Sequence, residues 1–555
     1  ILAAGSLVDD LTIANVKNPD VVGSTGTYTI QTTDATDVVI DEDTAVLADT
    51  TMAGALTATN VQPASLTAGV TGNVTVTFTP EHALPATGKI LVTFPAGFSL
   101  TAVQATNASS TLINGGLTAG VSGQTVTISR SGTGGVINAG TVINDLVIAN
   151  VRNPIVSGSG GMYTIATANS GALVIDQNTS VAADSFVAGV LSGTNVQPAS
   201  LVAGALGNAA VTFTTQSAIP ADGYMEVTFG SGFNVAGVTG ASSAADINGG
   251  LTTTVSGQTV RVTRNGAGGS VGAGATVDDL VIAGVKNPVV SGTTGVYAIA
   301  TYYSSGVVID DNTNVTADTI AVGSLSAANV QPASLVAGAV GNVTVTFTAA
   351  NPIPADGKIL VTFGSGFDIT GVGATNAASA LDINGTLTVS RSGQVLTIAR
   401  SGGSAVAAGA VIDDLVIANV KNPVVSGSTG VYAIKTTTTG SPDLDIDQDL
   451  SVTADTITVG SLTNANVEPL TSLVAGAAGN VRVDFTTANP IPVGGKIIIV
   501  FPPGFALSSG AATAVAAGST IDGSFNVNIN SQTVTLTRTG GGQSDQLPAA
   551  ETLTL

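Results

Sequence analysis

The chain has 555 residues and a net charge of −21, and only 9% of its residues are charged, against about a quarter in a typical soluble protein. It has no cysteine and one histidine, His82, which excludes disulfides, thiolate metal sites, cysteine nucleophiles and multi-histidine metal sites. The acidic balance argues against nucleic acid as a partner, and the sequence holds no apolar run of about 18 residues that would predict a membrane span.

Internal repetition dominates the sequence. The motif Asn-Val-(Gln/Glu)-Pro begins at Asn60, Asn195, Asn329 and Asn466, and the motif (Lys/Arg)-Asn-Pro begins at Lys17, Arg152, Lys286 and Lys421. Both motifs recur every 134 to 137 residues. Two unrelated motifs with one period indicate tandem copies of a single structural unit of about 135 residues.

The phase of the motifs predicts five segments. Three whole repeats are expected at 57–191, 192–325 and 326–462, and 1–56 is expected to be the C-terminal part of a preceding repeat. Residues 463–555 are expected to be the N-terminal part of a following one. Half a sandwich leaves apolar faces and strand edges bare. Either the chain continues in a longer protein, or another molecule completes each broken repeat by head-to-tail strand donation.

Within a repeat, the pattern predicts strands. Residues 73–79, 89–94 and 124–130 alternate apolar residues with Thr or Ser, as a half-buried strand does. Gly- and Pro-containing turns such as 85–88 and 114–116 separate these runs, and no amphipathic helix with caps is evident. We therefore expect an all-β fold of tandem Ig-like β-sandwich repeats, arranged as an elongated rod.

The motifs also carry a family resemblance. Their order is Gly-Lys-Ile-Leu-Val-Thr-Phe-Pro-Ala-Gly-Phe (88–98), Ser-Gly-Gln-Thr-Val-Thr-Ile (122–128), Val-Lys-Asn-Pro (285–288) and Gly-Val-Tyr-Ala-Ile (295–299). This pattern resembles tandem immunoglobulin-like sandwich repeats of extracellular surface and filament proteins. The resemblance implies a secreted or cell-surface structural role without catalysis. The single histidine fits that expectation, because the other repeats have no histidine at its position, and we interpret His82 as a surface-loop residue.

Acidic residues recur at one phase of the repeat, close to the junctions between units. The candidate metal ligands among them are Asp41, Asp43, Asp49, Asp310, Asp311, Asp318, Asp445, Asp447 and Asp455. Clustered carboxylates suit calcium, which takes six to eight oxygen ligands. The alternative is a polar turn that keeps an edge strand soluble. Calcium is the candidate ion, and no other cofactor is expected. A second acidic pair, Asp278-Asp279 and its equivalents such as Asp413-Asp414, is interpreted as a bulge or turn.

Two further residue types recur with the period. Tyrosines that begin an apolar strand lie at Tyr28, Tyr163, Tyr297 and Tyr432, and we expect each to bury its ring and satisfy its hydroxyl. Arginines that end a strand lie at Arg130, Arg264, Arg400 and Arg538. The arginines could pair with local acids or form contacts between subunits.

The composition suggests how such repeats are used. A repeat protein with few charges leaves apolar surface that invites association or needs a glycan coat. Candidate N-glycosylation sequons occur at Asn73, Asn107, Asn178, Asn314, Asn342 and Asn384. We expect a structural subunit of an extracellular filament or surface layer whose partners are copies of itself and glycans. The alternative is the stalk of a cell-surface adhesin.

Overall fold

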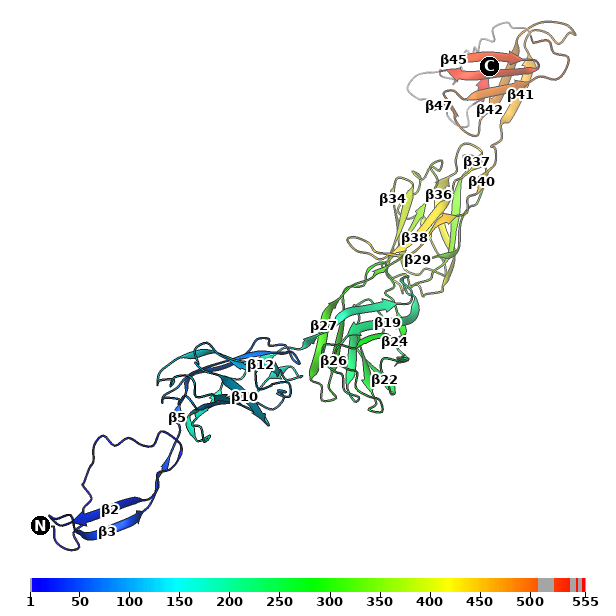
Figure 1. The fold of residues 1–555 in the computed structure, drawn as a ribbon. Coiled ribbons are helices and arrows are strands. Elements are labelled where there is room, and N and C mark those ends of the chain that lie inside the picture. Colours follow the sequence, from blue (N-terminus) through cyan, green and yellow to red (C-terminus); the bar gives the residue numbers. More distant parts are fainter. Residues whose placement is uncertain (1, 508–523, 540–545, 548–551, 555) are drawn as a thin grey trace. The chain divides into compact units, whose positions relative to one another are not determined.

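The computed structural model describes residues 2–507, 524–539, 546–547 and 552–554, so parts of the segment 463–555 lie outside the described residues. Strands and turns account for the secondary structure of the described residues, and three similar sandwiches follow one another along the chain (Figure 1). The all-β prediction and the tandem arrangement of sandwiches are confirmed. The chain divides into two compact units, one of residues 1–199, 207–285 and 295–317, and the other of residues 200–206, 286–294 and 318–555.

The first sandwich pairs a six-stranded sheet, in the order β10-β11-β8-β14-β15-β5, with a four-stranded sheet, in the order β6-β7-β12-β9. A two-stranded ribbon, β13-β16, follows. The strands of the first sandwich and its ribbon are β5 (Gly54–Ala55), β6 (Thr57–Pro63), β7 (Thr71–Thr79), β8 (Lys89–Thr93), β9 (Ala108–Ser109), β10 (Leu117–Ser122), β11 (Thr125–Arg130), β12 (Ile143–Arg152), β13 (Gly158–Ser159), β14 (Tyr163–Ala168), β15 (Val174–Val181) and β16 (Ser185–Phe186).

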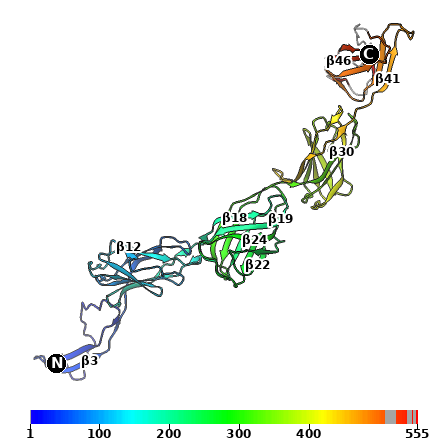
Figure 2. The ribbon, with the colours of Figure 1, turned by 45° about the vertical axis from the view of Figure 1, so that its right-hand side comes forward.

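The second sandwich repeats this plan, with the sheets β17-β27-β26-β20-β23-β22 and β18-β19-β24-β21 and the ribbon β25-β28. In Figure 2, β18, β19 and β24 mark its four-stranded sheet and β22 belongs to the opposite one. Its strands are β17 (Gly189–Val190), β18 (Ser192–Pro198), β19 (Leu206–Thr214), β20 (Tyr224–Thr228), β21 (Gly240–Ser242), β22 (Leu251–Ser256), β23 (Thr259–Arg264), β24 (Thr276–Lys286), β25 (Gly292–Thr293), β26 (Tyr297–Tyr302), β27 (Val308–Val315) and β28 (Thr319–Ile320).

The third sandwich has the sheets β29-β39-β38-β32-β35-β34 and β30-β31-β36-β33 and the ribbon β37-β40. Its strands are β29 (Gly323–Ser324), β30 (Ser326–Pro332), β31 (Val340–Thr348), β32 (Lys358–Thr362), β33 (Ala377–Ala378), β34 (Thr386–Ser392), β35 (Val395–Ser401), β36 (Val411–Lys421), β37 (Gly427–Ser428), β38 (Tyr432–Thr437), β39 (Asp445–Val452) and β40 (Thr456–Ile457). Sheets of six and four strands differ from the four and three of a constant-type immunoglobulin domain, so the Ig-like assignment stays a prediction.

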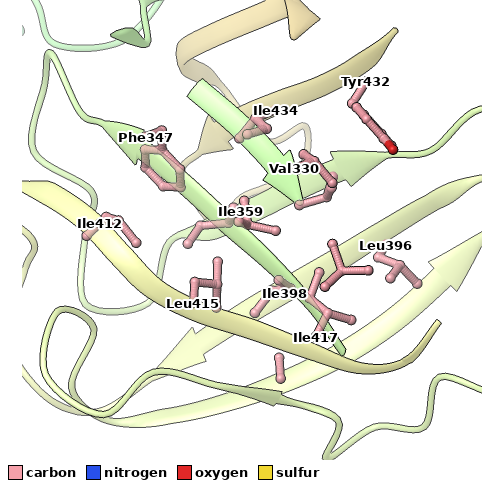
Figure 3. Close-up of a cluster of buried hydrophobic side chains, with 14 of the residues drawn as sticks. Val330, Phe347, Ile359, Leu396, Ile398, Ile412, Leu415, Ile417, Tyr432 and Ile434 are labelled. Carbon is pink, nitrogen blue, oxygen red and sulfur yellow. The ribbon is translucent and has the colours of Figure 1, made fainter. Parts of the chain in front are cut away.

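Each sandwich encloses its own core, because inward positions alternate with Thr on the paired strands. Along β31, Val343, Val345 and Phe347 are buried and the intervening threonines are partly exposed. Figure 3 shows Phe347 in the buried cluster together with Ile417 of the neighbouring strand β36 and Ile398 of the opposite sheet. The separate buried clusters fall within residues 56–186, 191–315 and 325–452.

The two terminal segments are less complete. The first contains β1 (Gly23–Ser24), β2 (Tyr28–Thr33), β3 (Val39–Val46) and β4 (Thr50–Thr51), paired as β2-β3 and β1-β4. The last contains β41 (Thr463–Pro469), β42 (Val481–Thr486), β43 (Ile491–Pro492), β44 (Lys496–Val500), β45 (Ser524–Asn530), β46 (Thr533–Thr539), β47 (Gln546–Leu547) and β48 (Thr552–Thr554). They pair as β41-β42-β48, β44-β46-β45 and β43-β47.

The second acidic pair lies in a bulge, as predicted. The pairing of β12 with β7 shifts register between Ile143 and Leu146, and Asp145 lies within that shift. Its carboxylate accepts a hydrogen bond from the amide of Thr111 at 2.6 Å. In the third sandwich, the carboxylate of Asp414 accepts a hydrogen bond from the amide of Leu381 at 2.6 Å. These carboxylates fasten the loop that follows the short edge strand.

Candidate functional site

The most distinctive polar feature of each complete sandwich is a fully buried aspartate: Asp176 on β15, Asp310 on β27 and Asp447 on β39. In each case a threonine hydroxyl on the neighbouring strand accepts a hydrogen bond from the backbone amide of the aspartate, as Thr436 Oγ1 does from Asp447 N at 3.1 Å. Burying a carboxylate costs free energy that hydrogen bonds to its oxygens offset. These three residues therefore need partners in the loops around them.

The partners come from the loop between the third and fourth strands of each sandwich. Asp310 Oδ2 accepts the amides of Gln216 and Ser217 at 2.9 and 2.7 Å. Asp447 accepts the amide of Asn351 at 2.8 Å and its side-chain Nδ2 at 2.7 Å. Burial raises the pKa of Asp310 and of Asp447, and the hydrogen bonds from the loop offset only part of that effect.

A glycine lies against each of these carboxylates. Gly54, Gly189 and Gly323 lie in the two-residue strands β5, β17 and β29, which run parallel to β15, β27 and β39. A Cβ built on any of the three would overlap Oδ1 of the aspartate in the same sandwich. The aspartate, the loop and the glycine form what we call the junction latch, which fastens the incoming linker to the sandwich that follows.

Replacing Gly323 by alanine tests the latch. The new methyl group would displace Asp447 or strand β29, so we expect the local opening of β29 to become easier by about 1–3 kcal/mol. The amide of Leu325, which donates to Gln448 O, should then exchange with solvent roughly tenfold faster or more. Gly341→Ala is the control, because nothing lies within 4 Å of its Cβ position. Equal exchange in the two variants would refute the latch.

His82 belongs to the latch of the first sandwich. Its amide and its Nδ1 lie 2.9 and 2.7 Å from the carboxylate of Asp176, as Asn351 lies against Asp447. Sequence reasoning placed His82 in a surface loop and missed this pairing. The available signal was position, because His82, Ser217 and Asn351 share one phase of the repeat and all can donate hydrogen bonds.

Glu81 completes a small cluster by accepting the amide of Ala55 at 2.6 Å. Glu81, His82 and Asp176 are the one group of three or more His, Asp or Glu side chains within the described ranges whose potential ligand atoms all lie within 4.8 Å of one another. The hydrogen bond from His82 to Asp176 and that from Ala55 to Glu81 account for the arrangement without an ion.

The His82–Asp176 pair should make the first junction sensitive to pH. The hydrogen bond to Asp176 raises the pKa of His82, and partial burial offsets some of that rise. The contribution of this pair to the stability of the first junction is therefore complete below about pH 6.5. It is lost as the pH rises through the raised pKa of His82. An NMR titration of this single histidine should give a pKa above 6.5, and His82→Asn should remove the pH dependence of the protection of Leu56 N, which is its exchange rate relative to the intrinsic rate at the same pH. A pKa at or below 6.5 would contradict the pairing.

The acids predicted as calcium ligands have separate hydrogen-bonding roles. Asp41, Asp43 and Asp49 are exposed on the β2-β3 hairpin and the chain after it. Asp310 and Asp447 belong to junction latches, Asp311 is half-buried beside Asp310, and the amide of Asp318 donates a hydrogen bond to Thr294 Oγ1. Asp445 pairs with Lys435 at 2.8 Å, and Asp455 accepts the hydroxyl of Tyr432 at 2.9 Å. Calcium binding stays a prediction.

The recurrent tyrosines behave as predicted in the complete sandwiches. Tyr163, Tyr297 and Tyr432 are fully buried, and the hydroxyl of Tyr163 donates to Asp184 at 2.7 Å. The ring of Tyr163 meets Phe94 edge-on at 5.8 Å. For Tyr28 the prediction of burial is wrong, because the residue is 43% exposed, although its hydroxyl donates to Asp49 Oδ2 at 3.1 Å. Among the strands that the structure describes, none forms an opposing sheet over β2 and β3 like the one that covers the other three rings.

Among the described residues, the recurrent arginines Arg130, Arg264 and Arg400 form no ion pair with local acids, and a contact between subunits stays a prediction. Arg130, Arg264 and Arg400 are buried, and each guanidinium donates to backbone carbonyl oxygens of the loops around it. In the third sandwich, Arg400 reaches Ile353 O at 2.9 Å and Ser404 O at 2.8 Å. Burial lowers the pKa of all three. Arginine ends its strand where loop carbonyls converge, so the two terminal nitrogens of its guanidinium bind them together.

The candidate glycosylation residues differ in accessibility. Asn73, Asn314, Asn342 and Asn384 are exposed, as a glycan requires. Asn107 and Asn178 are half-buried: Asn107 Oδ1 accepts the amide of Gln104 at 2.7 Å, and Asn178 Nδ2 donates to Thr59 Oγ1 at 2.9 Å. Glycosylation stays a prediction at all six.

The fold and its latches define a tandem β-sandwich repeat protein. No known family and no curated protein matches the sequence. Among solved structures, the C-terminal domain of the Streptococcus pyogenes antigen I/II-family protein AspA is similar at 9% identity and a TM-score of 0.19, over 49% of this chain and 99% of that one. The N-terminal domain of a Streptococcus gordonii adhesin is similar at 10% identity and a TM-score of 0.20, over 71% and 88%. Similarity this low carries no inference about function.

Where the chain is described, it contains no helix with the length and apolar character needed to cross a membrane.

Proposed function

We propose that this chain is a structural subunit of an extracellular filament or surface layer. The observation that carries the proposal is the junction latch, which recurs in all three complete sandwiches with the same buried aspartate and the same glycine. A latch of this kind fastens each sandwich to the linker before it. Such repetition suits a protein whose task is to span distance and bear load.

The recurrent polar residues support a structural role. The buried aspartates, arginines and tyrosines are all engaged in holding loops, strands and linkers in place. The absence of cysteine makes the fold independent of redox conditions. We propose copies of the same chain as its main partners, joined by strand donation, with glycans on the exposed asparagines. Neither an enzymatic activity nor a nucleic-acid partner is part of the proposal.

Electron microscopy of the protein from its native source tests the proposal. We expect regular fibres or a lattice whose spacing corresponds to a whole number of sandwiches. Isolated particles that never associate would contradict the filament role and favour the alternative, the stalk of a cell-surface adhesin. Chelation tests calcium separately, and a melting temperature that is unchanged by the chelator would exclude a stabilising ion.

A further inference from the structure

The loop that holds each buried aspartate also contacts a glycine of the sandwich before it, and we call this contact a joint. In the third sandwich, Asn351 Nδ2 donates to Asp447 at 2.7 Å and to Ala203 O of the second sandwich at 3.1 Å. A Cβ on the neighbouring Gly204 would overlap Asn351 Oδ1. All four residues lie in one compact unit of the chain. One amide side chain therefore ties the latch to the preceding sandwich.

The same tie recurs one repeat later. Asn489 is the equivalent of Asn351, and its Nδ2 donates to Ala337 O of the third sandwich at 2.9 Å. A Cβ on Gly338, the equivalent of Gly204, would overlap Asn489 Oδ1. Two joints thus share one chemistry, in which a neutral amide packs against a glycine that has no side chain to exclude it.

The joint between the first and second sandwiches lacks this amide. The equivalent of Asn351 there is Ser217, whose side chain is shorter. The backbone amides of Gln216 and Ser217 both bind Oδ2 of Asp310. Within the described residues, the buried Oδ1 of Asp310 has no hydrogen-bond partner, whereas Oδ1 of Asp447 accepts Asn351 Nδ2. Serine therefore leaves undone what asparagine does at the next joint.

A second departure from the repeat lies at the same joint. Among the (Lys/Arg)-Asn-Pro motifs only one has arginine, and Arg152 Nε donates to Gly69 O at 2.9 Å. A Cβ on Gly69, the equivalent of Gly204, would lie 2.5 Å from Ser217 Oγ and 3.7 Å from Arg152 Nη2. The three atoms nearest to the Cβ position of Gly204 all belong to Asn351. A guanidinium of the first sandwich and a hydroxyl of the second therefore share the space that one asparagine fills elsewhere.

Tyr303 of the second sandwich brings a further polar group to this joint. Its hydroxyl oxygen is buried and has no hydrogen-bond partner among the described residues. Burial raises the pKa of Tyr303, the charge of Arg152 lowers it and the charge of Asp310 raises it. The guanidinium of the first sandwich and the buried carboxylate of the second therefore act on the same hydroxyl. These residues all lie in the other compact unit of the chain.

We propose that Arg152 ties the first sandwich to the second, in the role that Asn351 has at the next joint. Its Nε is anchored on Gly69 O, so its terminal nitrogens remain for the groups of the second sandwich. Arg152 and Ser217 are then a matched pair, because the arginine reaches forward where the serine is too short to reach back. This inference goes beyond the proposed function, since it concerns a single chain and holds whether or not copies associate.

The spread of distances between the two sandwiches tests the pair. The natural chain has no cysteine, so Thr118→Cys and Thr252→Cys place one spin label on each sandwich of the full chain. Both positions are exposed and lie on equivalent edge strands, β10 and β22. Double electron–electron resonance at high dilution should give one narrow distance distribution, because the joint holds the two sandwiches in a single arrangement.

Substitutions at the joint should then behave as a coupled pair. Arg152→Lys alone should broaden the distribution, because serine cannot supply the missing tie. Ser217→Asn alone should also broaden it, because the longer side chain meets the guanidinium in front of Gly69. The double variant should restore the narrow distribution, since it reproduces the lysine and asparagine of the next joint.

Arg261→Lys is the matched control, because Arg261 pairs with Glu226 at 2.8 Å inside the second sandwich and should leave the distribution unchanged. Circular dichroism of each variant checks that the sandwiches remain folded. A double variant as broad as the two single variants, or an Arg152→Lys chain as narrow as the natural one, would overturn the pairing. Isolated particles in native material would count against the proposed function and leave this result untouched, because the labelled chain is measured as a monomer.

Discussion

Phe347→Ala is expected to destabilise the third sandwich by about 3–5 kcal/mol, the usual cost of truncating a buried phenylalanine. Phe347 is 1% exposed on β31, within the core that Figure 3 shows. The two sheets are held apart by the other core side chains, so the space left by the ring cannot close fully. The loss should appear as faster amide exchange throughout the third sandwich and not in the first.

The matched control for Phe347 is Val340→Ala on the same strand. Val340 is 63% exposed, so its truncation should change the stability by less than about 0.5 kcal/mol. Hydrogen exchange resolved by peptide is the appropriate measurement, because the unfolding transitions of three similar sandwiches overlap. A Phe347 variant that exchanges like the Val340 variant would show that this position is not part of a packed core.

Arg400→Met is expected to destabilise the same sandwich by about 2–4 kcal/mol, since bonds from a charged donor contribute about 1.5–3 kcal/mol each. Methionine fills much of the space but removes the guanidinium donors to the carbonyl oxygens of Ile353, Pro354 and Ser404. Ile353 O and Pro354 O keep one backbone amide donor each. Burial lowers the pKa of Arg400, which means that burying the charge is itself costly. Removing that cost is why the expected loss is smaller than the sum of the bonds.

Arg391→Met is the control for Arg400, because Arg391 is exposed on the adjacent strand β34. We expect the unfolding free energy of the Arg391→Met variant to stay within about 0.5 kcal/mol of that of the original chain. Faster exchange of the loops at 353–354 and 402–404 should be specific to the Arg400 variant. Equal behaviour of the two variants would show that the buried guanidinium does not hold these loops.

Periodicity made the architecture predictable from sequence. The alternation along residues 73–79 indicated a strand, and β7 buries Val74, Val76 and Phe78 as that alternation requires. The common spacing of two motifs indicated tandem copies, and the tyrosine position indicated a buried ring. These features succeed because they depend on local pattern and on repetition, both of which a single sequence displays.

The junction latch could not be predicted because its parts lie far apart in sequence. Asp447 follows an apolar residue in a strand and looks like a solvent-facing acid, yet its partner Asn351 lies 96 residues earlier. Strand β29 has two residues and therefore no periodicity to detect. Arg400 failed for a related reason, since backbone carbonyl acceptors leave no trace in side-chain patterns.

The mass distribution of the purified full chain, measured by sedimentation velocity over a range of concentrations, tests the central claim most directly. A structural subunit that associates with copies of itself should form a series of species at multiples of 54.0 kDa, and the larger species should become more abundant as concentration rises. A single 54.0 kDa species at every concentration, with the sandwiches folded, would contradict the claim that this chain builds a polymer from copies of itself.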